Sequence, residues 1–158
     1  MIRQASVDDL SLIAAFIREL AEYEKLADAV EFDEEELRRS LFGDRPFAEV
    51  LIAEDEGAGV GFALFFHNFS TFLGRPGIYL EDLFVRPQAR GKGFGKALLA
   101  RLAQLAVERG CGRVEWAVLN WNQPSIEFYA ALGARAKSDW TTYQLSGEAL
   151  RALGSIPG

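Results

Sequence analysis

The chain has 158 residues, of which 49% are hydrophobic and 25% are charged, a composition typical of one soluble globular domain with a full core. Its formal net charge of −6 argues against nucleic acid as a partner, because surfaces that bind nucleic acid are basic. No apolar run approaches the ~20 residues needed to cross a bilayer, and the N-terminus lacks the apolar core of a secretory signal, so we expect no membrane association.

Cysteine and histidine each occur once, as Cys111 and His67. One cysteine cannot form an internal disulfide, and it is expected to behave as a small apolar residue of a cytoplasmic protein. With no histidine or cysteine partners nearby in sequence, we expect neither a metal site nor a histidine-based catalytic triad.

The first third of the chain predicts a short strand and two helices. Residues 2–5 are extended in pattern, and Ser6, with an acidic residue three positions later, is typical of a helix N-cap. Apolar residues at three- and four-residue spacing then predict a helix that ends near Lys25. A second helix is expected to begin at residues 33–36, an acidic first turn, and to end near Phe42.

From Ala48 onward the pattern becomes that of a sheet. Strands are expected at residues 50–54, 60–66 and 78–85, separated by a hairpin turn and by a loop rich in glycine and proline. A long helix should follow and end at about Arg109, before Gly110 and Gly112.

The C-terminal third predicts a strand at residues 113–119, a short helix from Pro124, a last strand at 140–145 and a helical turn at 147–153. No linker, repeat or low-complexity run interrupts the chain. We therefore expect one α/β domain over residues 1–158.

The segment between the strand at 78–85 and the long helix predicts an anion site. Free amides at the start of a helix carry the positive end of its dipole, and glycines let a phosphate approach them. The residues expected to contact the anion are Arg90, Gly91, Lys92, Gly93, Phe94, Gly95 and Lys96. A nucleoside-triphosphatase loop is disfavoured because Ala97 stands where a hydroxyl is needed, and Lys96 breaks the dinucleotide-binding pattern. A flexible turn that binds nothing is the remaining alternative.

The pattern Arg-x-x-Gly-x-Gly, from Arg90 to Gly95, resembles the pyrophosphate loop of the GNAT superfamily of N-acetyltransferases. Three stretches, Glu19–Glu24, Tyr79–Val85 and Trp121–Tyr129, are similar to its diamine (spermidine/spermine) and thialysine acetyltransferase branch. The resemblance implies a mixed, mostly antiparallel central sheet flanked by helices, with strands splayed around the pyrophosphate loop. It also implies acetyl-CoA as co-substrate, no metal, and a homodimer.

The same resemblance implies the cofactor contacts outside the loop. Backbone groups of Leu83, Phe84 and Val85 should align the acyl arm, and the segment with Asn122, Pro124 and Ser125 should contact the pantetheine. For Asn122, capping of the short helix is an equally simple role.

Acetyl transfer to an amine needs a proton donor for the departing thiolate and a partner for the ammonium. The resemblance assigns the acid to Tyr129, for which a core tyrosine is the alternative. It assigns amine contacts to Tyr23, Glu24, Glu81 and Asp82. Strand alternation predicts that Glu81 and Asp82 point to opposite faces, and we favour Glu81 as the catalytic one.

One departure concerns the segment before Trp140, which is shorter than in the diamine enzymes. An acidic substrate contact has no secure counterpart there, although Asp139 could replace it. The sequence thus predicts an acetyl-CoA-dependent N-acetyltransferase acting on a small cationic primary amine. A non-catalytic acyl-CoA-binding module and an enzyme that acetylates a protein amine are the alternatives.

Overall fold

Residues 1–158 of the computed structural model divide by their contacts into two units, Met1–Leu119 and Asn120–Gly158. The first unit contains a five-stranded sheet in which the strands follow one another in sequence order. The strands are β1 (Ile2–Gln4), β2 (Glu49–Asp55), β3 (Ala58–Ser70), β4 (Arg75–Val85) and β5 (Val114–Trp116). The first four pair antiparallel and β5 pairs parallel to β4, which makes the sheet mixed and mostly antiparallel, as the sequence predicts.

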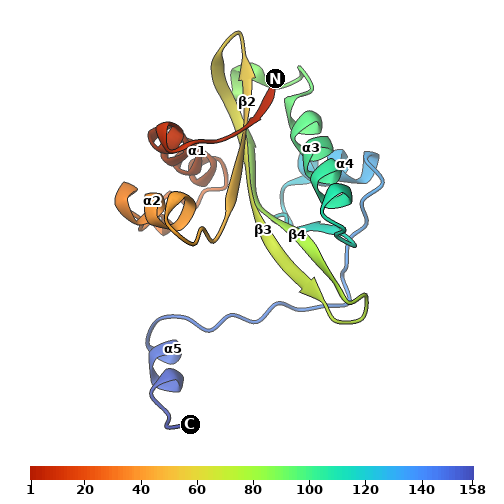
Figure 1. The fold of residues 1–158 in the computed structure, drawn as a ribbon. Helices are drawn as coiled ribbons and strands as arrows, with labels where there is room; N and C mark the ends of the chain where they lie inside the picture. The colour runs from red at the N-terminus through yellow and green to blue at the C-terminus, as the bar shows by residue number, and fades with distance from the viewer. The chain divides into compact units, whose positions relative to one another are not determined.

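Helices cover both faces of this sheet (Figure 1). Helices α1 (Leu10–Tyr23) and α2 (Glu34–Phe42) lie on one face, and α3 (Phe94–Glu108) lies on the other. Short 3-10 turns join the elements at Val7–Asp9, Ala27–Ala29 and Pro87–Ala89.

Side-chain alternation assigns each strand residue to a face. In β3, Phe62 and Leu64 belong to the core packed against Phe16 of α1, and the Phe16 and Phe62 rings stack at 5.3 Å. Phe65 therefore faces the α3 side, where the Arg109 guanidinium lies 5.9 Å from its ring centre. This assignment fixes which side chains of β4 can meet α1.

The helix signals in the sequence are confirmed. The Ser6 backbone N–H donates to Asp9 at 2.8 Å, so the predicted cap forms, and the Glu36 N–H donates to Asp33 at 2.8 Å, which adds a cap to the predicted acidic first turn. Helix α1 ends at Tyr23, and Lys25 has a φ of 61°, a left-handed conformation that stops the helix two residues before the predicted end.

The second unit contains α4 (Gln123–Ala131) and α5 (Gly147–Gly154). The strand predicted at residues 140–145 is wrong, because the structure has no strand there. The residues have high strand propensity, but that propensity measures fit to a sheet and is not realised without a pairing partner. The strand predicted at 113–119 is shorter, since only Val114–Trp116 pairs with β4.

Candidate active site

Strand β4 carries a bulge at Glu81. Leu80 pairs with Phe65 and Asp82 pairs with Leu64, so Glu81 has no opposing residue on β3. Bulges bend a strand and re-aim its side chains, and they are frequent beside active sites. The bulge therefore changes which face the following residues of β4 use.

The bulge moves Asp82 to the face opposite the one that regular alternation gives it, and the expectation that Glu81 and Asp82 point to opposite faces stays a prediction. Asp82 pairs with Leu64 and Tyr79 pairs with Phe66, so Asp82 and Tyr79 share the α1 face although they are three residues apart. Burial, followed by the charge of Glu81, raises the pKa of both Tyr79 and Asp82. Regular alternation fails because the extra residue shifts the register by one.

Glu24, Glu81 and Asp82 form an acidic cluster, defined here by these three residues. Burial, then the charges of Glu81 and Glu24, raise the pKa of Asp82 to about 7. Burial also raises the pKa of Glu24, at the C-terminal end of α1. The cluster brings together three of the four residues predicted to contact the amine, and a bound ammonium ion would be attracted by all three carboxylates.

The raised pKa of Asp82 gives a stability prediction. The ordinary pKa of an aspartate is 3.8, and in the folded chain the Asp82 carboxyl keeps its proton up to a pH of about 7. The folded protein therefore loses stability as the pH rises from 3.8 toward 7. Asp82→Asn should therefore stabilise the protein at pH 8 by roughly 1–2 kcal/mol, less than the full shift because Asp82 is only half-buried. At pH 4 the variant and the wild type should differ little. Urea unfolding of both proteins at the two pH values measures this, and an equal difference at both would contradict it.

The outer edge of β4 is open beside the cluster. Strand β5 pairs with β4 only at Ile78, Tyr79 and Leu80. The Arg86 N–H donates to the Val60 carbonyl of β3 at 2.8 Å, and hydrogen-bonding directions alternate along an antiparallel strand. Leu83 and Val85 therefore turn their N–H and C=O groups to the side where no strand pairs. An extended arm that carries amides could bind there as an added strand, as the sequence predicts.

The loop that follows β4 has the geometry of an anion cradle. Gly91 and Gly93 have φ angles of 80° and 87°, which favour glycine, and neither has a heavy atom within 4 Å of where a Cβ would lie. Helix α3 begins at Phe94 with Gly93 as its N-cap. Free amides, open space and a helix N-terminus fit the diphosphate of coenzyme A.

Two of the three cations predicted for the loop have partners elsewhere in the protein. The Lys92 ammonium lies 2.9 Å from the Asp55 carboxylate. Arg90 donates from Nε to the Val85 carbonyl at 2.8 Å, and its guanidinium lies 5.0 Å from the ring centre of Tyr23. Arg90 thus contacts both the open edge of β4 and Tyr23, a residue that is predicted to contact the amine.

An ion pair that the sequence did not predict, between Arg86 and Glu19, holds α1 against this site. Arg86 donates from Nε and Nη2 to the Glu19 carboxylate at 3.1 Å, and its guanidinium lies 4.8 Å from the Phe16 ring centre. Arg86 also donates to the Gly59 carbonyl at 3.2 Å. This contact fixes the end of β4 relative to α1 and hence Tyr23 relative to the loop. The only signal in the sequence is an arginine before Pro87, which is too common to be informative.

In the second unit, Asn122 caps α4. Its side chain is buried, and its Oδ1 accepts a hydrogen bond from the Ser125 N–H at 3.4 Å. Pro124 occupies the first turn of the helix, where its missing N–H costs nothing. The capping role left open by the sequence is confirmed, and the pantetheine contact stays a prediction.

Tyr129 lies near the end of α4 and is half-buried. Its ring centre lies 5.6 Å from that of Phe128, and its carbonyl accepts from the Leu132 and Ala134 amides at 3.1 and 3.2 Å. The ring is anchored within its own unit without being enclosed. Its role as the acid stays a prediction.

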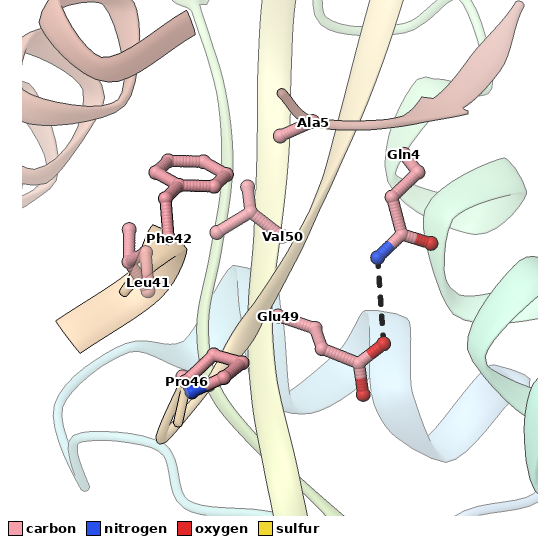
Figure 2. Close-up of a pocket in the computed structure, with 8 residues that line it drawn as sticks. Gln4, Ala5, Leu41, Phe42, Pro46, Glu49 and Val50 are labelled. Atoms are coloured by element: carbon pink, nitrogen blue, oxygen red, sulfur yellow. Dashed lines mark hydrogen bonds between the residues drawn. The ribbon is translucent and has the colours of Figure 1, made fainter. Parts of the chain in front are cut away.

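A pocket of about 270 Å³ lies away from all these residues, between the first strands and the end of α2. Figure 2 shows Gln4 donating to Glu49 at its edge, and the Glu49 carboxylate also accepts from Arg109 at 2.7 Å. The lining residues are Gln4, Ala5, Leu41, Phe42, Pro46, Ala48, Glu49 and Val50. None of them is a predicted site residue, and the one carboxylate among them is already ion-paired.

Comparison with known proteins agrees with this geometry. Residues 14–134 match the acetyltransferase (GNAT) family. The chain is 43% identical to a thialysine N-epsilon-acetyltransferase of Bos taurus, over 97% of this chain and 96% of that protein. It is 32% identical to an L-ornithine N5-acetyltransferase of Arabidopsis thaliana, over 98% of this chain and 88% of that protein.

A solved structure of an integron cassette protein from V. cholerae superimposes with a TM-score of 0.82 at 28% identity, covering 99% of this chain and 98% of that one. The fold and nearly the whole length of the sequence are therefore shared with these proteins. The chain belongs to the acetyltransferase (GNAT) family.

Proposed function

We propose that the protein transfers the acetyl group of acetyl-CoA to the terminal primary amine of a small cationic substrate, a thialysine- or ornithine-like amino acid or a diamine. Family membership makes it an acetyl-CoA-dependent N-acetyltransferase of small amines. Thialysine and ornithine, named in two relatives, are both amino acids whose side chain ends in a primary amine. The observation that carries the proposal is the acidic cluster beside the open edge of β4.

In the proposed ternary complex, the loop from Arg90 to Lys96 holds the diphosphate of coenzyme A. The outward groups of Leu83 and Val85 pair with the pantetheine amides and bring the thioester to the bulge at Glu81. Phe84 faces α1, where its buried ring lies 6.4 Å from that of Phe16, so its side chain holds the strand in place and does not contact the arm.

The amine enters as an ammonium ion and must lose a proton before it attacks. Glu81 and Asp82 hold the ammonium, with Glu81 as the catalytic carboxylate. Glu24 and the ring of Tyr23 complete the subsite that binds the ammonium ion. Glu81 holds the ammonium ion and passes its proton to water. Tyr129 donates a proton to the departing thiolate.

The proposal is tested by thiol release from acetyl-CoA with a panel of thialysine, ornithine, short diamines and spermidine. Glu81→Gln should raise the KM of the best amine by about ten- to a hundredfold, because it loses a charge-assisted contact, and should leave the KM of acetyl-CoA nearly unchanged. Equal effects on both constants would point to a folding role for Glu81. Binding of acetyl-CoA without turnover of any amine would favour a non-catalytic module, and turnover only with a protein amine would favour the other alternative.

We further propose that residues 1–158 act as a single domain, because the family match at 14–134 spans both units. A homodimer in the cytoplasm is proposed as well. The tip of the β3–β4 hairpin exposes large apolar side chains that a second copy could cover, Phe69, Phe72 and Leu73. A molar mass near 17.5 kDa in solution would contradict the dimer. No helix has the length and hydropathy required to cross a membrane.

A further inference from the structure

The contact between Arg90 and Tyr23 joins the two halves of the site. The Arg90 guanidinium lies 5.0 Å from the ring centre of Tyr23 and 5.7 Å from that of Phe84. Its Nε donates to the Val85 carbonyl at 2.8 Å. Arg90 belongs to the loop predicted to hold the diphosphate, whereas Tyr23 belongs to the subsite predicted to hold the amine.

A guanidinium on the face of an aromatic ring makes the same kind of contact as a substrate ammonium on that ring. In the free protein, Arg90 therefore occupies the contact that the amine would use on Tyr23. The backbone holds Arg90 at this position, because its N–H donates to the Pro87 carbonyl and closes the turn at Pro87–Ala89. The Arg90 side chain can therefore leave the Tyr23 ring without a change in the backbone of this turn.

A diphosphate bound at Gly91 and Gly93 would compete with Tyr23 for this guanidinium. Arginine binds phosphate through parallel charge-assisted hydrogen bonds, which are stronger than a contact with one exposed ring. Tyr23 is 37% exposed, so its contact with Arg90 is of the weaker, solvated kind.

We propose that Arg90 is a positioning residue that couples the two substrate sites. It covers the Tyr23 ring in the free protein and leaves the ring when the diphosphate of acetyl-CoA binds the loop. This inference rests on the proposed function. Because binding linkage is reciprocal, coenzyme A should strengthen amine binding and the amine should strengthen coenzyme A binding by the same factor.

The test is calorimetric titration of thialysine into the protein alone and into the protein saturated with coenzyme A, which cannot transfer an acetyl group. Coenzyme A should strengthen thialysine binding to the wild type by about tenfold. Arg90→Gln should bind thialysine in the absence of coenzyme A about as tightly as the saturated wild type does, and should lose the coupling.

Lys92→Gln is the matched control, because it removes a cation of the same loop whose partner is Asp55. Both variants should bind coenzyme A more weakly, but only Arg90→Gln should strengthen binding of thialysine to the free protein. Unchanged thialysine binding in Arg90→Gln, or equal thialysine affinity of the wild type with and without coenzyme A, would overturn the coupling. The proposed function would fail differently, since no amine of the panel would then be acetylated by the wild type.

Discussion

Gly93→Glu should weaken coenzyme A binding on the order of 10²-fold. Gly93 is the N-cap of α3 and has a φ of 87°, so a side chain there strains the loop that presents the amides. The added carboxylate would also lie where a diphosphate is expected, and loss of charge-assisted hydrogen bonds together with like-charge repulsion accounts for the size of the effect. Calorimetry with coenzyme A measures it directly.

Gly74→Glu separates strain from anion binding. Gly74 has a φ of 66° and open space around its Cβ position, as Gly93 has, but it lies in the β3–β4 turn. Both variants add the same charge and a similar backbone cost, so both should lose a similar amount of stability in thermal melts. Only Gly93→Glu should lose coenzyme A affinity. A Gly93→Glu protein that binds coenzyme A like the wild type would remove the loop from the cofactor site.

The helices around the site could be predicted because their signals are local. Apolar spacing and the cap at Ser6 indicate α1, the acidic first turn at residues 33–36 indicates α2, and the glycine loop marks the start of α3. The apolar run at 78–85 also identified β4. The resemblance of the sequence to the family indicated candidate site residues, and these lie at the end of α1 and in β4.

The bulge at Glu81 could not be predicted from the sequence. Alternation within one strand is a local property, but register depends on the partner strand, and here β3 shifts against β4 between Leu64 and Phe65. The shift places Asp82 on the same face as Tyr79, whereas regular alternation would put these two residues on opposite faces. The raised pKa of Asp82 is a consequence that only the paired structure reveals.

Two further features depend on contacts between distant residues. The strand predicted at 140–145 has the composition of a strand, yet in the structure these residues have no pairing partner. The contact of Arg90 with Tyr23 joins a loop cation to the end of a helix, and no spacing rule connects them. Motif resemblance assigned the two residues to different ligands and so gave no hint of a direct contact.

Tyr129→Phe should lower kcat by about 10²-fold or more if the hydroxyl supplies the proton to the departing thiolate, the range in which general acids act. The substitution keeps the ring, whose centre lies 5.6 Å from that of Phe128, and it leaves unchanged the backbone carbonyl that holds the end of α4. Stability should therefore change little in thermal melts. Steady-state kinetics with the best amine measures the effect on turnover.

The loss should appear in kcat and in kcat/KM together, because the hydroxyl acts mainly in the transition state. Coenzyme A affinity should stay close to that of the wild type, since the loop amides and the open edge of β4 carry it in the proposed site. Phe128→Leu is the matched control on the same helix, because it disturbs the ring pair and leaves the Tyr129 hydroxyl in place. If that variant loses turnover and Tyr129→Phe does not, Tyr129 has a packing role and the proton comes from solvent.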